Sequence, residues 1–184
     1  MSYALVRPGH YPLATSESDF TLKDGASVHI RPIRPQDEHY LVEIFNRSSP
    51  QTVYQRFFRA LRELTPAMAH YLSNVDYHYR LALIAETEFE PIGVVRYERT
   101  DDPDLVELGL IIVDDWQNRG LGRILLRKIL RAAEGNGFHR FLAYLLAGNR
   151  RMLRLLETEG QIQDWKIEAG VTTVSLTSRR TGAS

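Results

Sequence analysis

The sequence predicts one α/β domain of the α+β type, in which a mixed, mostly antiparallel central sheet is flanked by helices on both faces. Three observations predict this fold. Strand-like segments with a period of two are interleaved along the chain with segments whose apolar residues repeat at helical spacing. Three consecutive strand-like segments are separated only by short turns, as in an antiparallel meander. The chain has 184 residues, 43% of them hydrophobic, which is the size of one domain with its own core.

The first third of the chain predicts one strand and three helices. Residues 27–33 alternate as a strand does, and residues 35–45 open with Pro and carry apolar side chains on one helical face. Ser49-Pro50 and Thr65-Pro66 each combine a residue that caps helix N-termini with a proline suited to the first helical position. Each pair therefore predicts the start of a further short helix.

The rest of the chain predicts five strands and two longer helices. The expected strands are residues 80–86, 91–99, 105–113, 138–146 and 171–177. Residues 123–134 have apolar side chains on one helical face and basic ones on the other, and Gly135-Asn136-Gly137 ends that helix. Residues 149–159 repeat the helical pattern. The first three strands of this group form the predicted meander.

The chain ends lie outside the predicted domain, which we assign to residues 19–178. Residues 1–18 are rich in Pro, Gly, Ser and Thr and predict an N-terminal arm, and residues 179–184 predict a flexible tail. The first residues lack the apolar stretch of a secretory signal, and no apolar run is long enough to span a bilayer. We therefore expect a soluble, cytoplasmic protein with no membrane partner.

The composition argues against several classes of function. The 23 basic and 23 acidic residues cancel, so no global positive field favours nucleic acid as a partner. The absence of cysteine excludes disulfides, zinc–thiolate sites and an acyl-cysteine intermediate. The six histidines have no metal-ligand spacing, and neither Gly-x-Ser-x-Gly nor His-Glu-x-x-His occurs. We therefore expect neither a metal site nor serine-hydrolase chemistry.

Residues 105–122 carry the strongest chemical signal. An apolar strand is followed by Asp114-Asp115-Trp116, and the run Gln-Asn-Arg-Gly-Leu-Gly at 117–122 leads directly into the amphipathic helix. The first N–H groups of such a helix are unpaired, and the helix dipole adds positive potential, so the turn suits a pyrophosphate. The alternative is a tight connection without a ligand, because Gly-x-Gly before a helix is a weak signal alone. Arg119 and Arg123 flank the turn and favour the ligand.

The pattern Gln117-x-x-Gly120-x-Gly122 after an apolar strand resembles the acetyl-CoA motif of the GNAT superfamily of N-acetyltransferases. The order of elements over residues 27–177 also resembles the GNAT fold. Within the superfamily, residues 20–160 resemble the catalytic domain of Pat-type bacterial protein lysine acetyltransferases. The short runs that carry this second resemblance are Leu22-Lys23-Asp24-Gly25, Ile30-Arg31-Pro32-Ile33-Arg34-Pro35, Ser49-Pro50, Tyr54-x-Arg56-Phe57-Phe58 and Asp114-Asp115-Trp116-Gln117.

The resemblance implies an acetyl-CoA-dependent N-acetyltransferase that passes the acetyl group directly to an amine, in the first instance a protein lysine. It implies that backbone groups of Ile111, Ile112 and Val113 meet the pantetheine arm and that Asn149 lies beside the cofactor. The residues implied around the pyrophosphate are Gln117, Asn118, Arg119, Gly120, Leu121, Gly122 and Arg123. Basic residues between 119 and 154 suit a polyanionic cofactor, or else a solvated helix face.

Glu107 is the candidate general base, because it corresponds to the catalytic carboxylate of the Pat-type enzymes. A carboxylate within an apolar strand costs free energy unless it is paired, and burial raises its pKa toward a range useful for taking a proton from an ammonium. The alternative is a structural ion pair with Arg96 or Arg99 on the preceding strand. The remaining candidate carboxylates are Glu98, Asp114 and Asp115.

The sequence departs from the superfamily at two places, and it leaves the acceptor open. Many members have a tyrosine general acid where this chain has Leu156, and their Gly-Phe is Gly160-Gln161 here. Tyr54, Arg56, Phe57 and Phe58 could line an acceptor cleft or form plain core. Two other functions stay open: acetylation of a small-molecule amine, and a non-catalytic acyl-CoA-binding module. The general acid, the preferred acyl group and the oligomeric state cannot be read from the sequence.

Overall fold

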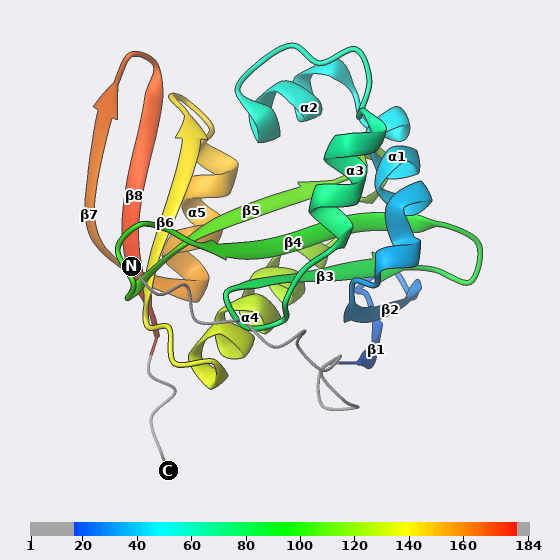
Figure 1. Cartoon of the computed structure of the whole chain (residues 1–184), viewed down its shortest axis with the longest axis horizontal. Coiled ribbons are helices and arrows are strands. Elements are labelled where there is room, and N and C mark those ends of the chain that lie inside the picture. The colour runs from blue at the N-terminus through cyan, green and yellow to red at the C-terminus, as the bar shows by residue number, and fades with distance from the viewer. Residues whose placement is uncertain (1–16, 180–184) are drawn as a thin grey trace.

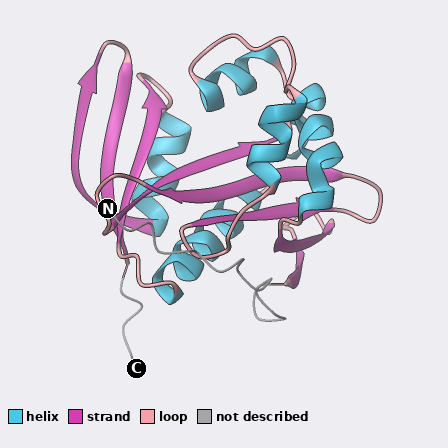
Figure 2. Ribbon diagram, viewed as in Figure 1, coloured by secondary structure: helices cyan, strands magenta, loops and turns pink. Residues whose placement is uncertain are grey.

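The computed structural model describes residues 17–179, which form eight strands and five α-helices (Figures 1 and 2). The strands are β1 (Ser18–Thr21), β2 (Ser27–Pro32), β3 (Arg80–Glu86), β4 (Pro91–Arg99), β5 (Leu105–Ile112), β6 (Arg140–Leu146), β7 (Gly160–Glu168) and β8 (Val171–Ser178). The helices are α1 (Glu38–Arg47), α2 (Pro50–Phe57), α3 (Pro66–Ser73), α4 (Leu121–Gly135) and α5 (Arg150–Glu159).

All strands belong to one sheet, whose order is β1-β2-β3-β4-β5-β6-β8-β7. Neighbouring strands are antiparallel except for β5 and β6, which are parallel. The parallel pairing joins residues 105–108 to residues 140–143 and goes no further, whereas β4 and β5 stay paired as far as Ile112. Figure 1 shows the consequence: β6, β8 and β7 turn steeply away from the direction of β3, β4 and β5. This divergence positions the candidate site.

The helices cover both faces of the sheet, as the sequence predicts. Helices α1 and α3 pack together on the face of β4 opposite α4, and α2 contacts both β5 and β6. Helix α4 packs on the other face, against β3, β4 and β5, and α5 packs beside it. The inward face of α4 is built from the buried residues Leu121, Leu125, Leu126, Ile129, Leu130 and Ala133. Burial of this apolar face is what holds α4 on the sheet.

The sequence correctly predicts the meander and the helix starts. The three meander strands are β3, β4 and β5, and their register is antiparallel throughout. The side chain of Ser49 accepts a hydrogen bond from the Thr52 N–H at 3.2 Å, and Thr65 caps α3 in the same way through the Met68 N–H. Helix α4 begins two residues earlier than expected, at Leu121, because Gly120 serves as its N-cap.

Two strands were not expected from the sequence. β1 is a short edge strand at the boundary assigned to the N-terminal arm. β7 is the opposite edge and is exposed along most of its length, so its side chains show no apolar alternation. It is defined by backbone pairing with β8 across a two-residue turn in which both Ala169 and Gly170 have positive φ. Such a turn is favoured by the strand twist rather than by side-chain burial.

The predicted arm (residues 1–18) and tail (residues 179–184) fall almost wholly outside the described residues, and the domain limits of 19–178 stay a prediction. Within residues 17–179, no helix is long and apolar enough to cross a membrane.

We expect Leu125→Ala to lower the free energy of unfolding by about 2–5 kcal/mol, because Leu125 is fully buried between α4 and the sheet and its truncation leaves a cavity. Arg131→Ala, on the exposed side of the same helix, is the control and should change stability by less than about 0.5 kcal/mol. Urea denaturation followed by circular dichroism measures both. Equal stabilities for the two variants would contradict the packing described above.

Candidate active site

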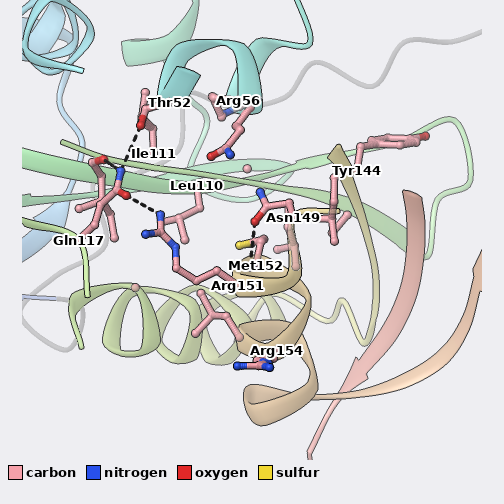
Figure 3. Close-up of a pocket in the computed structure, with 18 of the residues that line it drawn as sticks. Thr52, Arg56, Leu110, Ile111, Gln117, Tyr144, Asn149, Arg151, Met152 and Arg154 are labelled. Carbon is pink, nitrogen blue, oxygen red and sulfur yellow. Dashed lines mark hydrogen bonds between the residues drawn. The ribbon is translucent and has the colours of Figure 1, made fainter. Parts of the chain in front are cut away.

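The divergence of β5 from β6 opens a cavity of about 380 Å³ between the two strands. Its walls come from α2, from the continuous run of β5, loop and start of α4, and from β6 with α5, so three stretches that are distant in sequence meet there (Figure 3). Beyond Leu108 and Ala143, the facing edges of β5 and β6 no longer pair with one another. Backbone groups on these edges are therefore available to a ligand that enters between the strands.

Asp114 fixes α2 to the end of β5. Its carboxylate accepts hydrogen bonds from the Ser49 N–H at 2.7 Å, the Ser49 hydroxyl at 2.8 Å and the Thr52 hydroxyl at 2.9 Å. Burial alone raises the pKa of Asp114, but these hydrogen bonds outweigh it, so the pKa is lowered. Asp114 is thus an anchor of α2 that stays ionised.

Gln117 continues this polar network across the mouth of the cavity. Its amide N–H group donates to the Ile112 carbonyl at 2.8 Å and to the Thr52 hydroxyl at 3.2 Å. Its amide oxygen accepts from the guanidinium of Arg151, at the start of α5, and Arg151 also donates to Asn118 at 3.3 Å. Figure 3 shows the Thr52–Gln117–Arg151 chain between α2 and α5. The network holds the two sides of the cavity at a fixed separation.

The N-terminus of α4 faces the cavity through its two glycines. Gly120 has φ of 92°, a conformation that side chains disfavour, and it turns the chain into the helix. Gly122 lies over Leu110, Ile112 and Leu155, and a Cβ built there would touch them at ordinary distances of 3.4–3.8 Å. A side chain at 122 would therefore fit the protein and take up space in the cavity. At the start of an α-helix the first N–H groups have no i−4 partner. In α4 the Arg123 N–H donates back to the Gly120 carbonyl at 3.1 Å, which leaves the N–H groups of Leu121 and Gly122.

Two arginines expected at the pyrophosphate are already engaged within the protein. Arg123 lines the cavity, but its guanidinium pairs with the buried carboxylate of Glu159, which Arg127 also holds at 2.8 Å. Arg119 turns away from the cavity, where it stacks on Trp116 at 4.6 Å and pairs with Asp24 at 3.3 Å. Glu159 is a partner that the spacing of the basic residues could not reveal.

The other expected cofactor residues divide into two groups. Ile111, Ile112, Gln117, Asn118, Gly120, Gly122, Arg123 and Asn149 all line the cavity. Val113 and Leu121 do not: both side chains are in the core, and the Val113 N–H and carbonyl bond to Ile92 and Trp116. The backbone of Val113 is therefore engaged within the protein. Asn149 caps α5, since its side chain accepts from the Met152 N–H at 3.1 Å.

Glu107 lies on the α2 side of β5 and points into the cavity, not into the core. The expectation of a buried carboxylate needs correction, because the residue is exposed, while its neighbours Val106 and Leu108 face the opposite side and are buried. No ion pair joins Glu107 to Arg96, Arg99 or any other basic residue between 17 and 179, so the structural ion-pair alternative is not observed.

The surroundings of Glu107 nevertheless raise its pKa. The largest cause is partial desolvation: protein atoms around the carboxylate displace water and disfavour its charged form, although solvent still reaches the group from the cavity. The charge of Glu98, directly opposite on β4, also raises it, whereas Arg56 and Arg96 act in the lowering direction. The net effect is a carboxylate that takes up a proton more readily than an ordinary glutamate.

Arg56 reaches from α2 toward β5 (Figure 3), and it lines the cavity together with Glu107. Its guanidinium lies over Gly109 so closely that a Cβ there would fall 2.5 Å from Nη2. The absence of a side chain at Gly109 therefore admits Arg56 to the cavity. Of the neighbouring aromatic residues, Phe58 lines the cavity, Phe57 packs toward Phe45 in the core, and Tyr54 is exposed.

Several residues of the cavity had no distinctive sequence signal. Thr52 is a helix residue three positions after a cap, and Tyr144 is an alternating strand residue. Arg151 and Arg154 are three residues apart on α5 and therefore share one helical face, and this spacing is the signal that could have separated them from the other basic residues. Leu156, where many superfamily members have a tyrosine, is fully buried.

The family model for the "Acetyltransferase (GNAT) domain" matches residues 27–161. This chain belongs to the GNAT family of acetyltransferases. It is thus an acetyl-CoA-dependent acyltransferase, as members of that family are. An acetyltransferase of Pseudomonas aeruginosa is 33% identical over 136 residues, which are 72% of this chain and 73% of the relative.

Other GNAT proteins resemble the chain in sequence and in fold. Acetyltransferase Pat of Mycolicibacterium smegmatis is 27% identical over 144 residues, which are 77% of this chain but 43% of that protein. The GNAT domain of S. lividans PAT superposes with a TM-score of 0.83 at 29% identity, covering 91% of this chain and 99% of that domain. An acetyltransferase from Salmonella typhimurium, solved with acetyl-CoA, has the same fold at 19% identity, with a TM-score of 0.65 over 85% of this chain and 96% of that chain.

Within residues 17–179, no group of three or more His, Asp or Glu side chains is arranged to hold a metal ion.

We expect Glu159→Gln to lower stability at pH 7 by about 1–2 kcal/mol, because it removes the anion that pairs with two half-exposed arginines. Burial alone raises the pKa of Glu159, but its bonds to Arg127 and Arg123 lower it overall. A carboxyl with a lowered pKa stabilises the fold above its unfolded pKa and loses that effect as the pH falls through its folded pKa.

The difference between wild type and Glu159→Gln should therefore shrink as the pH falls below about 4. Urea titrations at several pH values measure it, with the exposed Glu157→Gln as the control. A difference independent of pH would show that the ion pairs contribute nothing.

Proposed function

We propose that this GNAT enzyme transfers the acetyl group of acetyl-CoA directly to the side-chain amine of a protein lysine. The observation that carries the proposal is the position of Glu107: an unpaired carboxylate with a raised pKa, facing the gap between β5 and β6. A general base needs such a position, because it must reach the amine at the moment of attack on the thioester.

The donor would lie in the cavity between the diverging strands. Beyond Leu108, backbone groups of β5 no longer pair with β6, and those near Ile111 that Gln117 does not occupy suit the amide groups of a pantetheine arm. The N-terminus of α4, at Gly120 and Gly122, suits the pyrophosphate, because unpaired N–H groups and the helix dipole favour an anion there. Gln117, Asn118 and Asn149 line the same path, and Arg151 and Arg154 add positive charge at its mouth.

The chemistry requires one proton transfer before attack. Glu107, directly or through a water, takes a proton from the acceptor ammonium, and the free amine attacks the thioester carbonyl. A carbon–nitrogen bond forms and the carbon–sulfur bond breaks. The attacking nitrogen then loses its extra proton, which passes directly or through solvent to the departing thiolate, so that coenzyme A leaves as a thiol. Backbone N–H groups on the free edge of β5 are suited to the developing oxyanion. No covalent enzyme intermediate is needed.

The similarity to the two Pat proteins supports a protein lysine as acceptor, at identities of 27% and 29%. The chain spans less than half of the M. smegmatis protein, so the similarity concerns only that part of it. A screen of coenzyme A release against proteins, lysine peptides and small amines tests the acceptor class. Turnover of small amines alone would favour the small-molecule alternative, and turnover of none would favour an acyl-CoA-binding module.

We expect Gly122→Val to weaken acetyl-CoA binding by about 10-fold or more while the fold is kept. The valine Cβ would lie at ordinary contact distances of 3.4 Å from Ile112 and Leu155, and the side chain would occupy the space through which a phosphate approaches the helix N-terminus. Isothermal titration calorimetry measures the affinity, and circular dichroism checks the fold. An unchanged affinity would place the phosphates elsewhere.

We expect Glu107→Gln to lower kcat by about 10²–10⁴-fold with nearly unchanged acetyl-CoA affinity. In the wild type, kcat/KM should rise with pH as Glu107 loses its proton. This rising limb of the pH profile should lie at a pH above 4.5, the ordinary pKa of a glutamate, because the pKa of Glu107 is raised. The variant should lack this limb. Glu98→Gln is the matched comparison: it removes a neighbouring negative charge and should move the limb to lower pH. Wild-type kcat in Glu107→Gln would make Glu98, which lies opposite Glu107 on β4, the next candidate for the base.

A further inference from the structure

A second hollow of about 350 Å³ adjoins the cavity on the α2 face of the sheet. The two hollows share Arg56, Glu107, Leu108, Gly109 and Tyr144, so they meet at the candidate base. The donor cavity extends from this boundary toward α4 and α5, and the second hollow extends toward the turn between β4 and β5. An acceptor that approaches Glu107 opposite the donor must enter through this second hollow.

Most charged groups of the second hollow already have partners. Glu98 accepts a hydrogen bond from the Tyr71 hydroxyl and pairs with Arg80 at 3.4 Å. Arg99 stacks on the ring of Tyr79 at 4.1 Å. These groups are therefore less available to a ligand.

Two guanidinium groups of the hollow lack an adequate partner. Arg56 makes no ion pair or hydrogen bond with any residue between 17 and 179. Its guanidinium carbon lies 5.2 Å from the centre of the Phe57 ring. Arg96 is 5% exposed: its Nη1 donates to the Leu72 carbonyl at 3.3 Å, but its Nη2 is buried without a hydrogen-bond acceptor, 3.9 Å from a Glu98 oxygen. A buried donor without an acceptor costs free energy that a bound anion would recover.

The two guanidinium groups lie side by side. Arg96 is the cross-strand partner of Gly109, and the Arg56 guanidinium rests on Gly109 on the same face of the sheet. Burial and the charge of Arg56 lower the pKa of Arg96 to about 10, so Arg96 remains a cation at neutral pH. Burial also lowers the pKa of Arg56, whereas the charges of Glu107 and Glu98 act in the raising direction. Adjacent like charges repel, and the repulsion is relieved by a carboxylate, which can accept hydrogen bonds from both.

We propose that the acceptor carries a carboxylate close to its amine, and that Arg56 and Arg96 bind this carboxylate while the amine meets Glu107. The proposal rests on the proposed function and adds which amines are preferred. The hollow suits a ligand that carries both an ammonium and a carboxylate. The two arginines attract the carboxylate, and Glu107 and Asp101, which also line the hollow, attract the ammonium. The carboxylate can come from an acidic residue beside an acceptor lysine or from a small amino acid.

Two matched pairs of acceptors test the proposal. The first pair is a lysine peptide with Glu beside the lysine and the same peptide with Gln. The second pair is free lysine and 1,5-diaminopentane, which lacks the carboxylate. We expect the carboxylate-bearing member of at least one pair to have the higher kcat/KM, by about 10–100-fold, the effect of one or two charge-assisted hydrogen bonds. The pair that shows the preference identifies the source of the carboxylate.

The preference should depend on Arg56. Arg56→Gln should reduce the ratio within the preferred pair to about 1–3, with acetyl-CoA affinity changed less than about twofold. Gly109→Ala keeps the charge but displaces the guanidinium, and it should reduce the ratio as well. Arg59→Gln, an exposed arginine just beyond α2, is the control and should keep the wild-type ratio.

Equal kcat/KM within both pairs for the wild type would overturn the proposal, and so would a preference that survives in Arg56→Gln. A loss of acetyl-CoA affinity in Arg56→Gln equal to the loss of rate would overturn it too, by assigning Arg56 to the donor. Turnover without preference leaves the proposed function intact, whereas no turnover with any amine contradicts that function. In the latter case, calorimetric binding of the two peptides to the protein saturated with coenzyme A still decides the carboxylate preference.

Discussion

The early end of the parallel pairing between β5 and β6 is the constraint on which the rest of the site depends. Four residue pairs join these strands. Beyond Leu108 and Ala143, β5 stays paired with β4 and β6 stays paired with β8, but β5 and β6 no longer pair with each other. The gap exposes backbone groups that a continuous sheet would use. It also exposes Glu107, the last outward-facing residue before the strands part on that face. Leu110 and Leu155 line the cavity beneath Gly122, and the Thr52–Gln117–Arg151 hydrogen bonds span its mouth.

The charges around the gap are divided between structure and chemistry. Arg119, Arg123 and Arg127 stabilise the protein through Asp24 and Glu159. The charges that lack such partners, Glu107 and Arg56, stand where the two hollows meet. Helix α2 links both roles, because the hydrogen bonds between its N-terminus and Asp114 hold it in place over β5, and its last turn then carries Arg56 to Gly109. Fixing the helix start thus determines which side chain borders the candidate base.

The predictable part of the site is the part that is contiguous in sequence. The segment from Ile111 to Gly122 is strand, turn and helix in immediate succession, so spacing alone brings its residues to one place. The prediction of pyrophosphate contacts failed where a side chain can turn either toward the cavity or toward another part of the protein. Arg119 and Arg123 flank the glycine turn as expected, yet one faces Asp24, nearly a hundred residues away, and the other faces Glu159. Glu107 was expected to be buried, because an apolar strand does not reveal where its neighbouring strand ends.

By itself, the sequence determined the mixed sheet with helices on both faces, the meander, the helix caps at Ser49 and Thr65, and the glycine turn before α4. These features depend on periodicity, propensity and local hydrogen bonds, which act over a few residues. Only the tertiary structure decided that β7 forms an edge strand, that Glu107 is exposed and unpaired, and that Arg56 lies over Gly109 beside Arg96. Such features arise from contacts between segments far apart in the chain, where the partner of each charge is set by packing and not by spacing.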